Sequence, residues 1–252
     1  MLEINNLSKI FGSLKAVDGV SLKLGRGEIR GLIGPNGSGK STTMNLISGS
    51  LKPSAGDVSL DGVRVEGFPS HRVARLGLVR TFQLTRVYTS GTLLEAVALG
   101  VRAAQGSAWN PKRWIPTGET AKINIAAFEA LERMGLASRA NEPAGNLPGG
   151  LRRVLSIATA LATRPRILLL DEPLAGLHAT EKAEVSTRVE QLRADGISIL
   201  LVEHDMKSVM RLCDRITVLN FGRVIAEGTP EEIGRHPEVI KAYLGRKRNS
   251  DA

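Results

Sequence analysis

A run of residues near the N-terminus has the types and spacing of a loop that binds phosphate. Glycines at three fixed positions let the backbone curl so that successive N–H groups point at phosphate oxygens, and the lysine can reach the β- and γ-phosphates. The serine after this lysine can hold Mg²⁺ through its hydroxyl group. The run consists of Gly34, Pro35, Asn36, Gly37, Ser38, Gly39, Lys40, Ser41 and Thr42. It predicts a site for a nucleoside triphosphate, and a purely structural turn is the competing interpretation.

An acidic pair follows a short apolar segment later in the chain. Residues 167–170 are all aliphatic and predict a buried parallel strand, after which come Asp171 and Glu172. Open α/β sheets place their ligands at the carboxyl ends of such strands. We therefore expect Asp171 to coordinate the Mg²⁺ at Ser41 or to bond one of its ligands, and Glu172 to activate the attacking water as a general base. An acidic pair can also end a strand by chance, so this assignment depends on Lys40.

A further apolar segment ends in a histidine. Residues 197–202 predict another core strand, and Glu203, His204 and Asp205 follow it. In one parallel sheet, His204 would face the same edge as Glu172, where it could hydrogen-bond the γ-phosphate and the attacking water. A histidine in a surface loop is the alternative. The position directly after a core strand favours the role in the site.

These groups require a parallel sheet and a helix that begins at the phosphate loop. Residues 28–33 predict the buried strand before the loop, and residues 40–48 the helix whose N-terminus faces the anion. Asp61 and Gly62 predict a tight turn between short strands. Three strands are expected in a separate antiparallel layer: 2–7, 20–24 and 56–60.

From about residue 85 the pattern becomes helical. One helix is expected to begin at Leu93, and a second carries the apolar stripe of Ala127, Leu131 and Met134. The parallel core resumes after residues 164–165. A later stripe predicts core packing rather than a cofactor surface, and it consists of Met206, Val209, Met210 and Cys213.

Composition restricts the class of protein. The chain has 252 residues, enough for one α/β domain with a sizeable core, and its single cysteine, Cys213, permits no internal disulfide. One cysteine and four scattered histidines make no structural zinc site. No apolar run approaches the roughly 18 residues that span a bilayer, and residues 1–5 do not begin a signal peptide. We expect a protein of the reducing cytoplasm, whose part in any transport depends on other chains.

The net charge of +9 suggests either nucleic acid or a membrane surface as a partner. Aromatic residues make up only 4% of the chain and are not interleaved with the basic ones, so no base-stacking surface and no nucleic acid are expected. Solvated faces explain most of the excess, and anionic lipid on the cytoplasmic side explains the remainder. The basic clusters are Arg72, Arg75, Arg80 and Arg86 around Gln83, then Arg152 and Arg153, and finally residues 246–248.

Taken in order along the chain, these motifs resemble those of the ATP-binding-cassette (ABC) ATPases. Phe11 is similar to the aromatic residue that stacks on adenine in that family, and Val17 to a residue near the ribose. Gln83 resembles the loop glutamine that contacts Mg²⁺ and water and moves with the membrane partner. Taken alone, Phe11 could be a core aromatic and Gln83 an ordinary loop amide. The family's signature, D-loop and switch histidine correspond to residues 147–153, 174–178 and His204.

The resemblance implies an α/β fold of the P-loop NTPase class, with a RecA-like parallel sheet core, an antiparallel β layer and a helical subdomain. It implies ATP and Mg²⁺ as cofactors. One ABC ATPase domain would fill residues 1–252, divided into a core of 1–84 and 165–235, a helical subdomain of 85–164 with an irregular insert at about 102–120, and a C-terminal extension of 236–252. The implied catalytic residues are Lys40, Gln83, Glu172 and His204. The implied metal ligands are Ser41, Gln83 and Asp171. Nucleotide contacts would come from Phe11, Val17, residues 34–42, Gly149 and Gly150.

The sequence departs from the family pattern in the signature and in the D-loop. Pro148 replaces the serine whose hydroxyl would bond the γ-phosphate, and Leu151 replaces the glutamine. Gly149 and Gly150 remain, so backbone amides at a helix N-terminus can still bind an anion. In this family the signature of one protomer covers the ATP of the other, so the change affects the partner's nucleotide. His178 stands where many relatives have aspartate, which concerns communication between the two sites.

The resemblance is closest to the ATPases that serve importers of branched-chain amino acids and related amides. It implies a peripheral protein on the cytoplasmic face of the inner membrane, paired with a second ABC ATPase subunit, as a hetero- or homodimer, and with integral-membrane permease subunits and, indirectly, an extracytoplasmic solute-binding protein. The insert holds Trp109 and Trp114 and is either a surface loop or a docking surface for the permease. The alternatives are the ATPase of a lipid or lipopolysaccharide exporter, a soluble ABC-type ATPase acting on nucleic acid or ribosomes, and a small-molecule kinase.

Overall fold

The computed structural model describes residues 1–81, 91–104 and 118–244; Gln83, Arg86 and most of the predicted insert lie outside these ranges. Its centre is a sheet of six strands: β3 (Ile29–Ile33), β6 (Leu78–Arg80), β7 (Ile167–Asp171), β8 (Ser198–Val202), β9 (Arg215–Asn220) and β10 (Arg223–Gly228). Their spatial order is β10-β9-β3-β8-β7-β6. All neighbours pair in parallel except β10, which runs antiparallel to β9 at one edge.

Both faces of this sheet are buried, which explains why β7 and β8 are almost entirely apolar. Because successive side chains of a strand point to opposite faces, each strand supplies two hydrophobic clusters. Leu168 and Leu170 of β7 enter the cluster beneath the helices, whereas Ile167 and Leu169 enter the cluster on the other face. The parallel core expected from the sequence is therefore confirmed, although β8 begins one residue later than predicted.

A second sheet is antiparallel and has the strand order β2-β1-β4-β5. Its strands are β1 (Leu2–Phe11), β2 (Leu14–Leu24), β4 (Ala55–Leu60) and β5 (Val63–Arg64). The first two extend beyond the predicted 2–7 and 20–24, because they pair with each other up to the short turn that joins them. Asp61 and Gly62 have φ values of 47° and 81° and form the predicted tight turn between β4 and β5.

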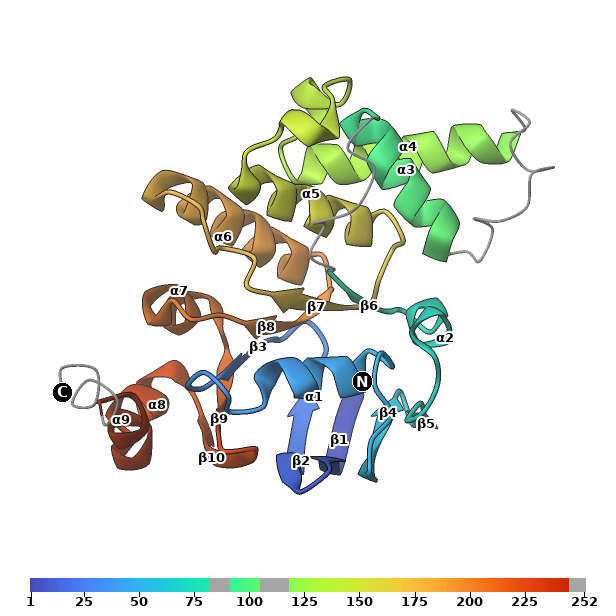
Figure 1. Ribbon diagram of the computed structural model, residues 1–252. Helices are drawn as coiled ribbons and strands as arrows, with labels where there is room; N and C mark the ends of the chain where they lie inside the picture. Colours follow the sequence, from blue (N-terminus) through green and yellow to red (C-terminus); the bar gives the residue numbers. More distant parts are fainter. Residues whose placement is uncertain (82–90, 105–117, 245–252) are drawn as a thin grey trace.

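One helix fills the space between the two sheets. It is α1 (Lys40–Ile47), whose Met44 and Ile47 are fully buried in the cluster that both sheets share. Figure 1 shows α1 between the strands of the antiparallel sheet and β3. The N-terminus of α1 is therefore held rigidly at the end of β3.

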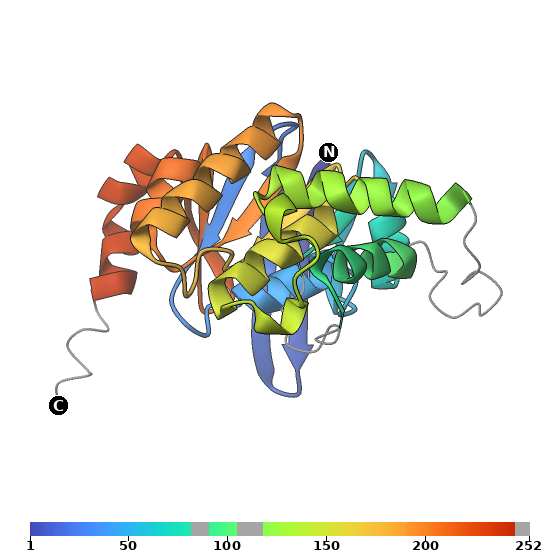
Figure 2. The ribbon, with the colours of Figure 1, turned by 90° about the horizontal axis from the view of Figure 1, so that it is seen from above.

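The opposite face of the six-stranded sheet is covered by helices. α5 (Gly149–Leu161), α6 (Ala179–Ala194) and α7 (Met206–Leu212) lie toward this face, and α3 (Leu93–Ala104) and α4 (Gly118–Arg133) pack against α5. The shorter elements are α2 (Ser70–Arg75), η2 (Ala137–Arg139), η3 (Ala144–Asn146), α8 (Pro230–Arg235) and α9 (Pro237–Leu244). Figures 1 and 2 both place α3 and α4 at one end of the molecule and α8 and α9 at the other. The helical subdomain boundaries at 85 and 164 remain predictions.

The helical stripes expected from the sequence pack in the core. Ala127 and Leu131 of α4 are fully buried, and Met134 follows the last helical residue at 2% exposure. Val209 and Cys213 are buried at the end of α7, and burial raises the pKa of the Cys213 thiol to about 12. In the described part of the chain, no helix has the length and apolar character needed to cross a membrane.

Candidate nucleotide-binding site

The phosphate loop joins β3 to α1 and has a backbone that only glycine tolerates at two points. Gly34 and Gly39 have φ values of 151° and 104°. A Cβ atom on Gly39 would lie 2.5 Å from the carbonyl oxygen of Ala16 on β2, and one on Gly34 would overlap the carbonyl oxygen of Leu219. Because these two positions have no side chain, β2 and β9 pack directly against the backbone of the loop. This packing holds the loop in its curled shape.

The polar groups of this loop are turned inward. The Lys40 ammonium donates to the carbonyl oxygens of Gly34 and Pro35, at 2.8 and 3.0 Å. The hydroxyl of Ser38 is buried and has no hydrogen-bond partner among the described residues. Ser41 is exposed at the first turn of α1. Since the Ser38 hydroxyl is buried, binding of a phosphate by this loop would depend on its backbone N–H groups and on Lys40, and it stays a prediction.

The acidic pair lies at the carboxyl end of β7, as the sequence predicts. Asp171 pairs with Val202 of β8 in parallel register, and Glu172 follows it with a φ of 49°. Two hydrogen bonds hold this uncommon backbone: the Glu172 amide donates to the Val202 carbonyl at 2.9 Å, and the Arg153 guanidinium donates to the Glu172 carbonyl at 2.8 Å. The second bond ties the helix that begins in the signature segment to the predicted base.

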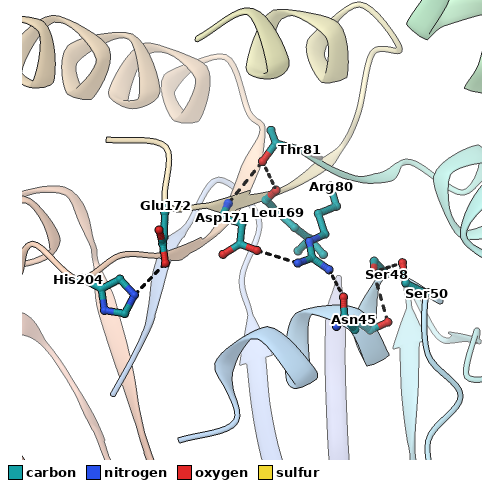
Figure 3. Close-up of polar contacts among 9 residues, drawn as sticks. All are labelled: Asn45, Ser48, Ser50, Arg80, Thr81, Leu169, Asp171, Glu172 and His204. Carbon is teal, nitrogen blue, oxygen red and sulfur yellow. Dashed lines mark hydrogen bonds and ion pairs between the residues drawn. The ribbon is translucent and has the colours of Figure 1, made fainter. Parts of the chain in front are cut away.

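Glu172 and His204 meet across the sheet edge. Nε2 of His204 lies 2.8 Å from Oε1 of Glu172, and both side chains remain partly exposed (Figure 3). His204 follows β8, the strand next to β7, so the pairing of the two strands produces this contact. The structure therefore places the predicted base and the predicted switch histidine side by side.

Asp171 has a partner that the sequence did not suggest. Arg80, the last residue of β6, donates from Nη2 to Oδ2 of Asp171 at 2.7 Å and from Nη1 to Oδ1 of Asn45 on α1 at 2.5 Å (Figure 3). Arg80 is one of the basic residues that the sequence groups around Gln83, but its side chain is only 12% exposed, so it adds little to a solvated face. Arg72 stacks on the ring of Phe68, with its guanidinium carbon 3.7 Å from the ring centroid.

Glu203 is a further residue that the sequence analysis passed over. Its carboxylate is 3% exposed and accepts the Leu174 amide at 2.7 Å and the His204 amide at 3.2 Å. Burial raises the pKa of this carboxyl group, and the two amide donors oppose the rise. By accepting both amides, Glu203 holds the backbone at Leu174, just after Glu172, in a fixed position relative to His204. Its position between a core strand and a histidine is the signal that could have identified it.

The signature segment begins α5. Pro148 precedes the helix and is exposed, as is Gly149, around which a Cβ atom would find open space. Gly150 is different, because a Cβ there would overlap the side chain of Leu177 in the predicted D-loop. Leu151, in place of the family's glutamine, packs partly against the main core. Within this chain, packing explains Gly150 and Leu151 but gives no reason for Gly149.

The remaining predicted contacts lie on the antiparallel sheet or outside the described residues. Phe11 ends β1 and is 47% exposed, with the ammonium of Lys9 at 5.2 Å from its ring centroid. Val17 is fully buried in the core, although its neighbour Ala16 touches the phosphate loop. A role for Phe11 or Val17 toward the nucleotide stays a prediction, as does the role of Gln83, which falls outside the described part.

Metal binding would depend on few groups of the chain. Among residues 1–81, 91–104 and 118–244, no cluster of three or more His, Cys, Asp or Glu side chains is arranged to hold a metal ion. The predicted ligands Ser41 and Asp171 are oxygen donors, the type that Mg²⁺ prefers. They fit a cation that brings phosphate and water oxygens as its other ligands.

The parallel sheet, the curled glycine loop and the acidic pair at its carboxyl edge define a P-loop nucleotide-binding ATPase. A family model described as "ABC transporter" matches residues 17–175, and one described as "Branched-chain amino acid ATP-binding cassette transporter" matches residues 223–248. The high-affinity branched-chain amino acid transport ATP-binding proteins BraF of Pseudomonas aeruginosa and LivG of Escherichia coli K12 are 41% and 42% identical to this chain, over 97% of its length and 98% of theirs.

A solved structure of an ATP-binding cassette of an ABC transporter, in its ADP conformation, is 32% identical. It superposes with a TM-score of 0.86 over 97% of this chain and 98% of its own. The chain belongs to the ABC transporter family and is an ATPase of that family. The fold class and the family resemblance predicted from the sequence are therefore confirmed.

Glu203 provides a test of how the site is held. The pKa of the Glu203 carboxyl group in the folded state lies above its ordinary value of 4.5. The stabilisation that Glu203 contributes is therefore complete below pH 4.5 and is lost as pH rises through the folded-state pKa. Glu203→Gln carries no charge and sets an amide donor against a backbone N–H. We expect it to be less stable than the parent by about 1–3 kcal/mol near pH 5.

The difference in unfolding free energy between parent and variant should then narrow as pH rises above 4.5 and through the folded-state pKa of Glu203. Urea unfolding at several pH values measures it directly. A difference that widens with pH would show that the two amide donors outweigh burial at this carboxylate.

Proposed function

We propose that this protein is the ATP-hydrolysing subunit of an importer for branched-chain amino acids or related small polar solutes. The observation that carries the proposal is the match of residues 223–248 to a branched-chain amino-acid cassette model, in a chain that aligns over 97% of its length with BraF and LivG. An exporter ATPase or a nucleic-acid ATPase finds no comparable support in these residues.

The types of residue in the site and their place at one sheet edge support hydrolysis of MgATP as its function. Lys40 would exchange its bonds to the Gly34 and Pro35 carbonyls for bonds to phosphate oxygens, and Ser41 and Asp171 would hold Mg²⁺. When bound, the metal neutralises negative charge on the phosphates that are being separated.

Glu172 then accepts the proton of the attacking water. The 2.8 Å contact with His204 orients the carboxylate toward that water. The bond from Arg153 to the Glu172 carbonyl keeps the base in place while its side chain acts.

Coupling to transport follows from the composite nature of the site. Two cassettes, this chain and a second ATPase subunit, close on two ATP molecules, each held between the phosphate loop of one subunit and the signature of the other. Closure moves the helical subdomains and the permease subunits that they contact, and hydrolysis reopens the pair. Gly149 presents its backbone to open space, which suits approach by the partner's nucleotide. The protein works at the cytoplasmic face of the inner membrane, next to chains that cross it.

The role of Glu172 is tested by an isosteric change. Glu172→Gln keeps the shape of the side chain but cannot accept a proton, so MgATP should bind normally while hydrolysis falls by roughly 10²-fold or more. Lys40→Ala is the control for binding and should weaken nucleotide affinity instead. ATP affinity and single-turnover phosphate release are measured for both in the assembled transporter. Hydrolysis at the parental rate in Glu172→Gln would rule out this base.

The transported solute is tested in proteoliposomes that contain the complete transporter. ATP inside the vesicles and leucine, isoleucine or valine with the solute-binding protein outside should give accumulation of the amino acid. The ATPase rate is expected to rise when the solute-binding protein and the amino acid are present. The Glu172→Gln complex serves as the matched control without turnover. Normal ATPase stimulation by the solute-binding protein with no uptake of these amino acids would leave the ATPase assignment intact and reject the solute.

The altered signature predicts unequal sites in a heterodimer. Pro148 has no hydroxyl or N–H, so it lacks a charge-assisted bond to the partner's γ-phosphate that is worth about 1.5–3 kcal/mol, or roughly 10- to 100-fold in rate. The site at the partner's phosphate loop should be the slower one. Glu172→Gln in this chain should therefore reduce transport more than the equivalent change in the partner.

Restoring the family pattern with Pro148→Ser and Leu151→Gln should narrow that gap. Because Leu151 packs partly against the core whereas Pro148 is exposed, Pro148→Ser alone is the sharper variant. Transport and ATPase rates are compared with one base removed at a time. Equal losses from the two single-base variants would show that the altered signature has no energetic consequence.

A further inference from the structure

The guanidinium group of Arg80 joins the two sides of the predicted metal site. One arm contacts Asp171 at the carboxyl end of β7, and the other contacts Asn45 on α1. The three side chains come from strands and a helix that are far apart in the sequence, and Figure 3 shows them in one row. Arg80 is 12% exposed and Asp171 is 18% exposed, so little water reaches their contact.

Asn45 brings Arg80 close to the second predicted metal ligand. Residues four positions apart on a helix lie on the same face, so Asn45 stands one turn beyond Ser41. Arg80 therefore lies between the helix face that carries Ser41 and the carboxylate of Asp171. A guanidinium group is positively charged at all accessible pH values, and its planar fork holds both partners in fixed directions.

In this position the positive charge of Arg80 repels a metal cation that approaches Asp171. The contact to Oδ2 of Asp171 occupies one of the two carboxylate oxygens and compensates the negative charge that would attract a divalent ion. A bare cation must displace or tolerate a nearby positive charge, and that lowers its affinity. A cation bound to a nucleotide brings phosphate oxygens and their negative charge with it. The repulsion between this complex and Arg80 is therefore weaker than for the bare cation.

We propose that Arg80 is a positioning residue that holds the Asp171 carboxylate in place as a substitute cation, so that the site takes up Mg²⁺ together with nucleotide and not alone. The proposal rests on the MgATP site described above. Between turnovers, Arg80 keeps the Asp171 carboxylate oriented and balances the negative charge of this partly buried group. A purely structural ion pair would lack any effect on metal uptake.

The test measures Mn²⁺ binding to the purified full-length chain without nucleotide, by electron paramagnetic resonance of the unbound ion. Arg80→Met removes the charge and keeps an apolar stem, and it should bind Mn²⁺ at least about tenfold more tightly than the parent, since an opposite charge at this distance changes ion affinity of a carboxylate by one or more powers of ten. Adding Asp171→Asn to Arg80→Met should abolish the gain. Arg80→Lys keeps the charge and should stay within about threefold of the parent.

Arg193→Met is the matched control, because it removes an arginine from a one-to-one pair with Asp214. It should leave Mn²⁺ binding unchanged. Arg80→Gln is a second neutral variant for the case in which Arg80→Met does not fold, as judged by circular dichroism, and it should show the same gain.

Equal Mn²⁺ affinity in the parent and in a folded neutral variant of Arg80 would overturn the proposal. A gain that survives Asp171→Asn would also overturn it, because the metal would then bind elsewhere. These measurements involve neither hydrolysis nor transport. A failure of the proposed ATPase role would appear in the Glu172→Gln assays, whereas a failure of the Arg80 proposal would appear only here.

Discussion

The parallel pairing of β3, β8, β7 and β6 is the constraint on which the site depends. These strands are neighbours in the sheet, and the segment or residue at the carboxyl end of each supplies one part of the site. The phosphate loop follows β3, His204 follows β8, Asp171 and Glu172 come at the end of β7, and Arg80 ends β6. Because both faces of the sheet are packed, the strands cannot shift in register without exposing a hydrophobic cluster. The polar groups are held in position by the apolar core beneath them.

A second set of contacts holds the backbone of the site rather than its side chains. Glu172 has a left-handed backbone, bonded to Val202 on one side and to Arg153 on the other. Glu203 binds the amides of Leu174 and His204 with a single buried carboxylate. Such contacts fix the direction in which the Glu172 side chain leaves the sheet, and they link α5, through Arg153, to this predicted base. Motion of that helix can therefore reach Glu172 through one hydrogen bond.

The two glycines of the signature serve different purposes. Gly150 lies close to the side chain of Leu177, so internal packing is a reason for its small size. Gly149 has open space around it, and its backbone is available to a second molecule. The exposed position of Gly149 is compatible with the proposal that a second cassette shares the site.

The sequence alone determined the phosphate loop, the strand that ends in Asp171, the strand that precedes His204, and the class of fold, since glycine spacing and apolar runs are local features. Even the turn at Asp61 and Gly62 follows from residue type, because few other residues adopt its backbone. Only the tertiary structure decided the partners of these groups. Arg80 belongs, by its sequence, to a basic cluster, and nothing local shows that it reaches Asp171, which is 91 positions away. Long-range pairing of charged side chains depends on which strands become neighbours, and that is settled by packing of the whole core.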